Sequence, residues 1–147
     1  MLLELARALV ALSLLALLTL AGCVSPTDPL GRKQALEDSQ RRYTNLIRWG
    51  DIEKASEFVD PALRQDFLGY AEELESMRVT DFEIGTIRYD ADDSAHVKVT
   101  YHGYSVGTFL EKPIREQQRW FREDGSSEWW VQPEIEGLIS ALDRATP

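Results

Sequence analysis

An apolar run close to the N-terminus limits how much of this chain can belong to a folded domain. Residues Ala8 to Leu20 form a run of thirteen mostly apolar positions, and in the short segment before it Glu4 offsets Arg7. A membrane-spanning helix needs about 20 apolar residues, whereas a run of this length is typical of a secretory signal peptide. We therefore expect residues 1–22 to be a signal peptide and the domain to form from the residues after it.

The end of the apolar run indicates how the exported chain is held. Leu20, Ala21 and Gly22 precede Cys23, the only cysteine in the chain. Small side chains before the cysteine let an extended backbone enter a peptidase groove, and the thiol is a nucleophile that can carry a diacylglyceryl group. This tetrapeptide resembles the lipobox of bacterial lipoproteins. The resemblance implies a thioether on Cys23, cleavage between Gly22 and Cys23, and acylation of the new amine by a fatty acid such as palmitate.

Residues 23–33 are expected to carry the lipid and to form a linker. They include Pro26, Pro29 and Gly31 and little apolar content. Ten extended residues reach about 33 Å, so the domain would stay close to the bilayer and face the periplasm. In enteric-type bacteria an Asp after the lipidated cysteine favours the inner membrane. Val24 therefore favours the outer membrane if the host is Gram-negative. The alternative is a short uncleaved anchor with an incidental cysteine.

The charge of the chain argues against nucleic acid as a partner. There are 16 basic and 25 acidic residues, which give a formal charge of −9. A surface with this charge repels polyanions on average. The expected partners are the membrane, through the lipid, and an envelope protein or a second copy of the chain.

Apolar spacing predicts three helices at the start of the domain, which we place at residues 34–147. The first carries an apolar stripe and ends at Gly50, after which Asp51 caps a short second helix. Asp60 and Pro61 start the third, which ends near Ser76. The apolar stripes comprise Leu36, Tyr43 and Ile47 in the first helix, Ile52, Ala55, Phe58 and Val59 in the second, and Leu63, Phe67, Tyr70, Ala71 and Leu74 in the third.

The composition after Met77 favours antiparallel strands. A change of parity at Gly85 predicts a bulge within the first strand rather than two strands. The second strand alternates, with Ala95, Val97, Val99 and Tyr101 on one face. A long strand over residues 112–123 is followed by the turn signal Asp124-Gly125 and a last strand over residues 128–132. Residues 135–145 are predicted to form a short C-terminal helix.

These elements predict an α+β fold with three N-terminal helices packed on a curved antiparallel sheet of about four strands. The order of elements resembles the NTF2-like (SnoaL-like) cone fold, in which a bent sheet wraps around helices and leaves a pocket at one end. The resemblance is carried by the helix break at Gly50-Asp51, by Asp60-Pro61, and by the hairpin over residues 115–131. Cystatin-like folds are the nearest alternative.

No catalytic, cofactor-binding or metal-binding constellation is predicted. His96 and His102 are six residues apart on one strand face, about 20 Å, so they cannot share a metal ion. Some cone-fold enzymes use a buried acid or base in the pocket. Depending on strand register, the candidates here are Glu116 with Gln118, or Gln117 with Arg119.

The tryptophans are the remaining candidates for a functional surface. Trp129 and Trp130 are adjacent on a predicted strand, so one faces the helices and the other faces outward and could form an interface. The neighbouring charges alternate in sign and predict a mixed-charge outer face; they are Arg115, Glu116, Arg119, Arg122 and Glu123. We expect a membrane-anchored envelope lipoprotein whose domain is a non-catalytic protein- or ligand-binding module. The alternative is a lipid-tethered enzyme that uses the cone pocket for acid/base chemistry.

Overall fold

The structure is a computed structural model that describes residues 31–107 and 110–134. The chain divides into two units, Met1–Gln34 and Ala35–Pro147, and the architecture below is that of the second. The predicted signal peptide, lipobox, most of the linker and the C-terminal helix over 135–145 lie outside the described residues. None of the helices within the described ranges is long and apolar enough to cross a membrane.

The longest helix among the described residues, α2 (Arg32–Trp49), ends as its sequence predicts. Gly50 has a φ of 71°, a conformation that glycine adopts without steric cost. The Gly50 amide donates to the Ile47 carbonyl at 3.1 Å and the Asp51 amide to the Leu46 carbonyl at 3.0 Å. These are the two hydrogen bonds of a Schellman motif, which satisfy carbonyls at the end of the helix.

The helices after α2 are shorter and more broken than predicted. They are α3 (Ile52–Ala55), the 3₁₀ turn η1 (Ser56–Phe58), α4 (Arg64–Gly69) and α5 (Ala71–Ser76). The Asp51 side chain does not cap α3, because it pairs with Lys54 instead. The predicted third helix is interrupted at Tyr70, which has φ −99° and ψ 13° and follows Gly69, a residue that weakens helices. Its predicted end at Ser76 is confirmed.

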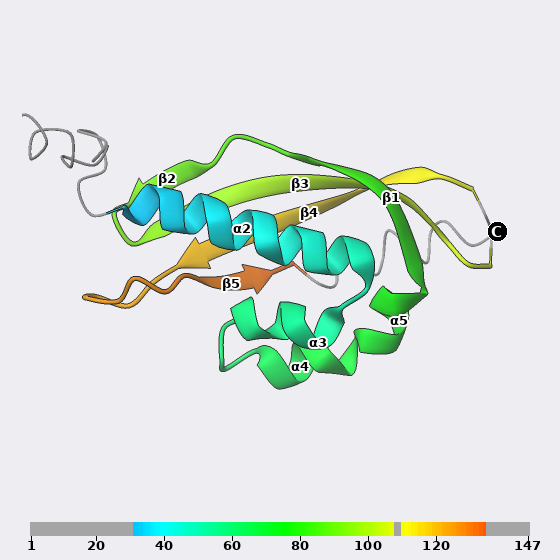
Figure 1. Ribbon diagram of the computed structural model, residues 1–147, viewed down its shortest axis with the longest axis horizontal. Coiled ribbons are helices and arrows are strands. Elements are labelled where there is room, and N and C mark those ends of the chain that lie inside the picture. Colours follow the sequence, from blue (N-terminus) through cyan, green and yellow to red (C-terminus); the bar gives the residue numbers. More distant parts are fainter. Residues whose placement is uncertain (1–30, 108–109, 135–147) are drawn as a thin grey trace, which may run out of the picture. The chain divides into compact units, whose positions relative to one another are not determined.

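The helices precede an antiparallel sheet of five strands, so the predicted α+β class is confirmed. The strands are β1 (Met77–Ile84), β2 (Arg88–Ala91), β3 (Ser94–Ser105), β4 (Lys112–Phe121) and β5 (Trp130–Pro133). Their order is β1-β3-β4-β5, and β2 also pairs with β3. Figure 1 shows β3 and β4 side by side, with α2 running along them.

The predicted bulge at Gly85 is wrong in two respects. The irregularity lies elsewhere in β1, and the segment forms two strands rather than one. The register shift in β1 falls between Val79 and Asp81, and the chain leaves the ladder after Ile84. It rejoins β3 as a separate strand, so β1 and β2 pair with different segments of the same partner. At Gly85 the amide donates to the Lys98 carbonyl at 2.8 Å, and a Cβ there would lie 2.9 Å from that oxygen. The absence of a side chain permits this close approach.

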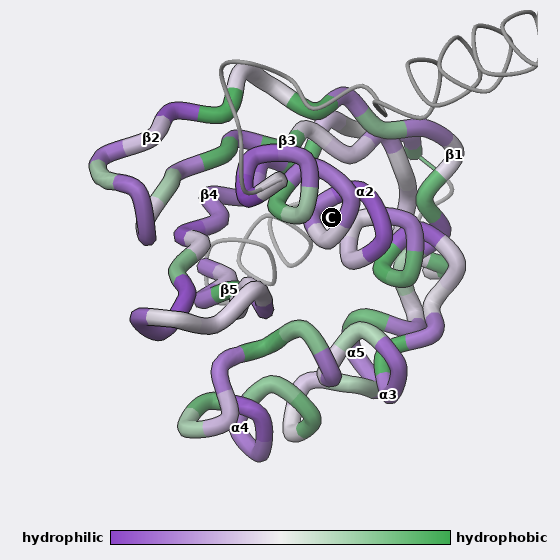
Figure 2. Tube along the Cα trace, turned by 60° about the vertical axis from the view of Figure 1, so that its left-hand side comes forward, coloured by the Kyte–Doolittle hydropathy of each residue, from purple (hydrophilic) through white to green (hydrophobic). Residues whose placement is uncertain are grey.

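The core forms between α2, the shorter helices and one face of the sheet. Ala95, Val97, Val99 and Tyr101 of β3 are at most 1% exposed, as the alternation predicts. In Figure 2 the trace of β3 changes repeatedly between hydrophobic and hydrophilic colours along its length. The helices contribute the buried side chains of Leu36, Tyr43, Ile47, Ile52, Ala55, Phe67 and Leu74.

The outer edge of β5 is paired by the chain itself. Val59 forms an isolated parallel bridge with Val131, and the Asp60 amide donates to the Val131 carbonyl at 2.9 Å. The Gln132 side chain donates to the Asp60 carboxylate at 2.9 Å. The segment between η1 and α4 therefore covers this part of the sheet edge.

Candidate functional site

A buried carboxyl group lies on the inner face of β4. The register places Glu116 opposite Val99 and Gln118 opposite Val97, and both of these valines face the core. Glu116 is 2% exposed and Gln118 is fully buried. The open choice of register is therefore settled in favour of Glu116 with Gln118 inside, while Gln117 and Arg119 face outward.

Three side chains donate hydrogen bonds to the Glu116 carboxylate. The Tyr43 hydroxyl lies 3.2 Å from Oε1, the Tyr101 hydroxyl 2.8 Å from Oε2, and the Gln118 amide nitrogen 2.7 Å from Oε2. Tyr43 reaches the group from α2 and Tyr101 from β3. The carboxyl group is therefore held by donors from three elements.

A second layer of hydrogen bonds extends this cluster across the core. Gln118 Oε1 accepts from Gln40 Nε2 at 3.3 Å and from Trp120 Nε1 at 3.1 Å. Gln40 also donates to the Thr44 hydroxyl at 3.0 Å. We call this set the Glu116 network; its members are Gln40, Tyr43, Thr44, Tyr101, Glu116, Gln118 and Trp120. Because buried polar groups are costly unless paired, these bonds make a polar interior tolerable.

Burial raises the pKa of the Glu116 carboxyl group above its ordinary value. The three donors act in the opposite direction, and the negative charge of Glu134 adds to the effect of burial. Burial, followed by the charge of Glu116, also raises the pKa of both tyrosines. Burial therefore shifts all three groups in the direction of their neutral forms.

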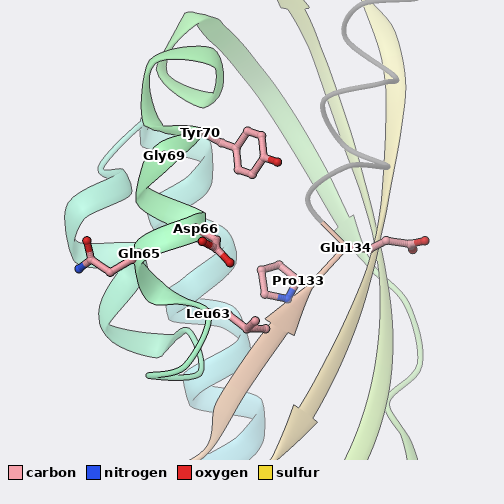
Figure 3. Close-up of a pocket in the computed structure, with 7 residues that line it drawn as sticks. All are labelled: Leu63, Gln65, Asp66, Gly69, Tyr70, Pro133 and Glu134. Carbon is pink, nitrogen blue, oxygen red and sulfur yellow. The ribbon is translucent and has the colours of Figure 1, made fainter.

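A pocket of about 590 Å³ opens between α4 and the end of β5. Figure 3 shows Asp66 of α4 and Tyr70, the residue after α4, pointing toward the strand side of the pocket, where Pro133 lies, while Gln65 points away. Glu134, whose charge acts on Glu116, also belongs to its lining. The remaining lining residues are Leu63 and Gly69. Glu116 is not part of this lining, so the pocket adjoins the buried network without exposing its carboxyl group.

A second concavity, of about 450 Å³, lies between α2 and the α3–η1 segment. Its apolar side chains are Leu46, Trp49 and Phe58. Trp49 is 76% exposed, and the Arg48 guanidinium lies 5.2 Å from the centre of its ring. Polar and charged side chains complete the lining: Arg41, Arg42, Asn45, Lys54 and Glu57. We call this concavity the α2–α3 groove.

The two adjacent tryptophans differ as alternation predicts. Trp129 is 4% exposed, and Trp130 opens β5 on the opposite parity to buried Val131. Trp130 is nevertheless only partly exposed, because the Arg64 guanidinium lies 5.8 Å from the centre of its ring. An interface at Trp130 stays a prediction.

Of the charges predicted to form a mixed-charge outer face, Glu116 instead points into the core. Arg115, Arg119 and Glu123 are exposed. Arg122 is 5% exposed, and its guanidinium donates to backbone carbonyls of Asp92 and Ser126. The two histidines lie outward and apart: His96 contacts Asp90 at 3.0 Å and His102 contacts Glu83 at 3.8 Å. Within the described ranges, no group of His, Cys, Asp and Glu side chains is arranged to hold a metal ion.

Sequence reasoning did not predict that Gln40 of α2 joins the Glu116 network, nor that Trp49 is exposed. Gln40 lies four residues after Leu36 and three before Tyr43, so it occupies a polar position on the apolar stripe of α2. That position was the available signal for a buried polar contact. Trp49 directly precedes the terminating glycine, and the local sequence does not indicate its 76% exposure.

Comparisons with known proteins leave the family open. No family model matches this chain. No curated protein matches it. A solved structure from Catenulispora acidiphila is similar, with 10% identity and a TM-score of 0.44 over 71% of this chain and 92% of that chain. A TM-score below 0.5 does not establish a shared fold.

Proposed function

We propose that this chain is a lipid-anchored protein of the bacterial cell envelope and that its domain is a non-catalytic binding module. The lipobox residues Leu20 to Cys23 support the anchor, and Val24 supports the outer membrane in a Gram-negative host. For the domain we propose the NTF2-like cone fold, which is supported by helices that precede an antiparallel sheet and pack on one of its faces.

The α2–α3 groove is the observation that carries the binding function. Trp49 is large, exposed and stacked by Arg48, so little side-chain freedom is lost when a partner covers it. Aromatic side chains of this kind dominate the binding energy of many protein interfaces. In contrast, both oxygens of Glu116 already accept hydrogen bonds from the protein itself.

The charges around the groove favour a partner segment with an apolar side chain flanked by carboxylates. The groove lining contains Arg41, Arg42 and Lys54 and one acid, Glu57, although the chain as a whole carries a charge of −9. Lys54 already pairs with Asp51, so the two arginines carry the charge that a partner would meet. Within the part of the chain that the structure describes, neither arginine forms an ion pair. Carboxylates on the partner would pair with these two arginines.

A peptide-binding measurement tests this function. The probe is a labelled peptide in which leucines are flanked by glutamates, and the matched peptide has lysines instead; fluorescence anisotropy reports binding to the full chain in detergent. We expect the acidic peptide to bind and Trp49→Ala to weaken binding by about tenfold or more. Tyr89→Ala, at an exposed aromatic elsewhere, should have no effect. Equal binding of both peptides, or no effect of Trp49→Ala, would contradict the proposal.

The alternative is a lipid-tethered enzyme that performs acid/base chemistry in the cone. A raised pKa at Glu116, between two tyrosines and beside the pocket of Asp66 and Tyr70, favours this second function. A local opening would have to bring substrate from that pocket to the carboxyl group. Soaking crystals with small carbonyl compounds distinguishes the two functions, because only the enzyme would show a ligand within hydrogen-bond distance of Glu116.

A further inference from the structure

A cluster of basic side chains lies on the outer face of the sheet, away from the Glu116 network. It surrounds a cleft of about 360 Å³ at the junction of β2, β3 and β4. The lining residues are Gly85, Thr86, Arg88, Asp90, His96, Lys98 and Gln117. These three strands are neighbours in the sheet.

Strand register brings these basic groups together. His96 pairs with Arg88 on one side and with Arg119 on the other, so three nitrogen-bearing side chains form one row across the sheet. Lys98 follows two residues later on the same face and pairs with Gln117. Neighbouring strands are about 4.8 Å apart and alternate residues about 6.8 Å apart, so the side chains can converge on one ligand.

The positive charges of Arg88 and Lys98 are gathered at this cleft with few carboxylates to balance them. Their direct cross-strand partners are His96 and Gln117, so the two charges are diagonal neighbours and do not lie opposite one another. The chain has 25 acidic residues, yet Asp90 is the only carboxylate in the lining of this cleft, and its oxygen is 3.0 Å from His96 Nε2. Across residues 31–107 and 110–134, neither Arg88 nor Lys98 forms an ion pair. Their charges are available to a ligand.

We propose that this cleft is a binding site for a phosphate group. The Arg88 guanidinium matches two phosphate oxygens in a bidentate arrangement, and the Lys98 ammonium adds a second positive charge. The Thr86 hydroxyl and the Gln117 amide are neutral donors at the same cleft. This donor set exceeds what the two oxygens of a carboxylate require and suits the three or four oxygens of a phosphate.

The Asp90 carboxylate opposes the bound anion. It lies in the cleft lining beside His96, and its negative charge would repel a bound phosphate. Removing the charge of Asp90 should therefore strengthen binding, whereas removing the charge of Arg88 or Lys98 should weaken it. These opposite effects distinguish a specific site from general attraction or from loss of folding.

Isothermal titration of inorganic phosphate into the full chain in detergent at low ionic strength tests the site. Lys98→Gln and Arg88→Gln should each weaken binding by about tenfold or more, the scale of a lost hydrogen bond to a charged group. Asp90→Asn should tighten it several-fold. Arg78→Gln is the matched control, because it removes an exposed positive charge on β1 away from the cleft, and it should change nothing. Circular dichroism shows whether each variant is folded.

Two further arms identify the source of the phosphate. Glycerol phosphate competes with inorganic phosphate if the ligand is a soluble ester. Vesicles of phosphatidylcholine with phosphatidic acid should bind the chain more tightly than pure phosphatidylcholine vesicles, in a Lys98-dependent way, if it is a headgroup. The proposal is overturned if inorganic phosphate does not bind saturably, or if Lys98→Gln and Asp90→Asn both bind it as the wild type does.

Discussion

At the scale of single residues, Glu116 places an ionisable group inside a largely apolar core. Its side chain is 2% exposed and accepts hydrogen bonds from three donors. The bonds from Tyr43 and Tyr101 link α2 and β3 to β4. Because burial raises its pKa, the folded state favours the protonated form. Stability should therefore depend on pH through this one group.

The first prediction concerns that dependence. The favourable effect of neutral Glu116 is fully present below the unfolded-state pKa, near the ordinary value of 4.5, and is lost as pH rises through the higher folded-state pKa. Glu116→Gln cannot ionise, so its stability relative to wild type should increase as pH rises through this window. Urea unfolding across pH 4 to 8 measures the difference. Exposed Glu123→Gln is the control, and parallel pH profiles for Glu116→Gln and wild type would contradict the interpretation.

The second prediction concerns packing by a single aromatic side chain. Phe67 is 1% exposed and its ring centre lies 6.4 Å from that of Tyr43, under the Glu116 network. Phe67→Ala should destabilise the protein by about 3–5 kcal/mol, the usual cost of emptying a large core site. Leu63→Ala should cost less, because Leu63 is only partly buried and lines the open pocket. Chemical denaturation that ranks Leu63→Ala above Phe67→Ala would contradict this placement.

The sequence predicted the residues of the apolar stripes but only part of the polar interior. Ile114 and Trp120 share one parity on β4 and Phe121 has the other, so the pattern alone left two registers open. Pairing with the clearly alternating β3 selects the first. The buried role of Gln40 depends on contact with β4, 78 residues away, and no local pattern specifies such a contact.

At the scale of elements, termini with strong local signals were predicted best. The end of α2 follows from a glycine with positive φ. The breaks at Tyr70 and between β1 and β2 lie beside Gly69 and Gly85, but a glycine alone does not specify whether an element is bent, bulged or divided. Tyr70 fits a helical stripe equally well in a continuous helix. Its conformation lets α4 and α5 each bury an aromatic or aliphatic side chain, Phe67 and Leu74 respectively.

The third prediction separates the two tryptophans beside β5. Trp129→Ala should cost about 3–5 kcal/mol of stability, because its side chain is buried. Trp130→Ala should cost about 1 kcal/mol, typical of a point substitution, because its ring is partly exposed to solvent and contacts Arg64. Thermal unfolding measures both. If the outer face forms the predicted interface, Trp130→Ala should also reduce self-association or a crosslinked species; a monomeric wild type with unchanged crosslinks would argue against it.

At the scale of the whole molecule, the proposed anchoring rests on a segment outside the described residues. The fourth prediction is that Cys23→Ser leaves the precursor unprocessed and unlipidated, because a hydroxyl does not replace the thiol in thioether formation. Metabolic labelling with a tagged fatty acid, followed by membrane fractionation, checks it. Equal labelling of wild type and Cys23→Ser would rule out the lipoprotein assignment.

The bridge between Val59 and Val131 bears on how copies of this protein can assemble. Polymerisation by strand addition needs two free edges on every copy, because each copy must receive one neighbour and offer itself to the next. Here the Asp60 amide already occupies the outward carbonyl of Val131, and Pro133 has no amide hydrogen to donate. One obstructed edge is enough to stop a chain of copies. Within the described residues, association through the β5 edge is therefore obstructed, so strand addition at the opposite edge would stop at a pair of copies and would not template fibres.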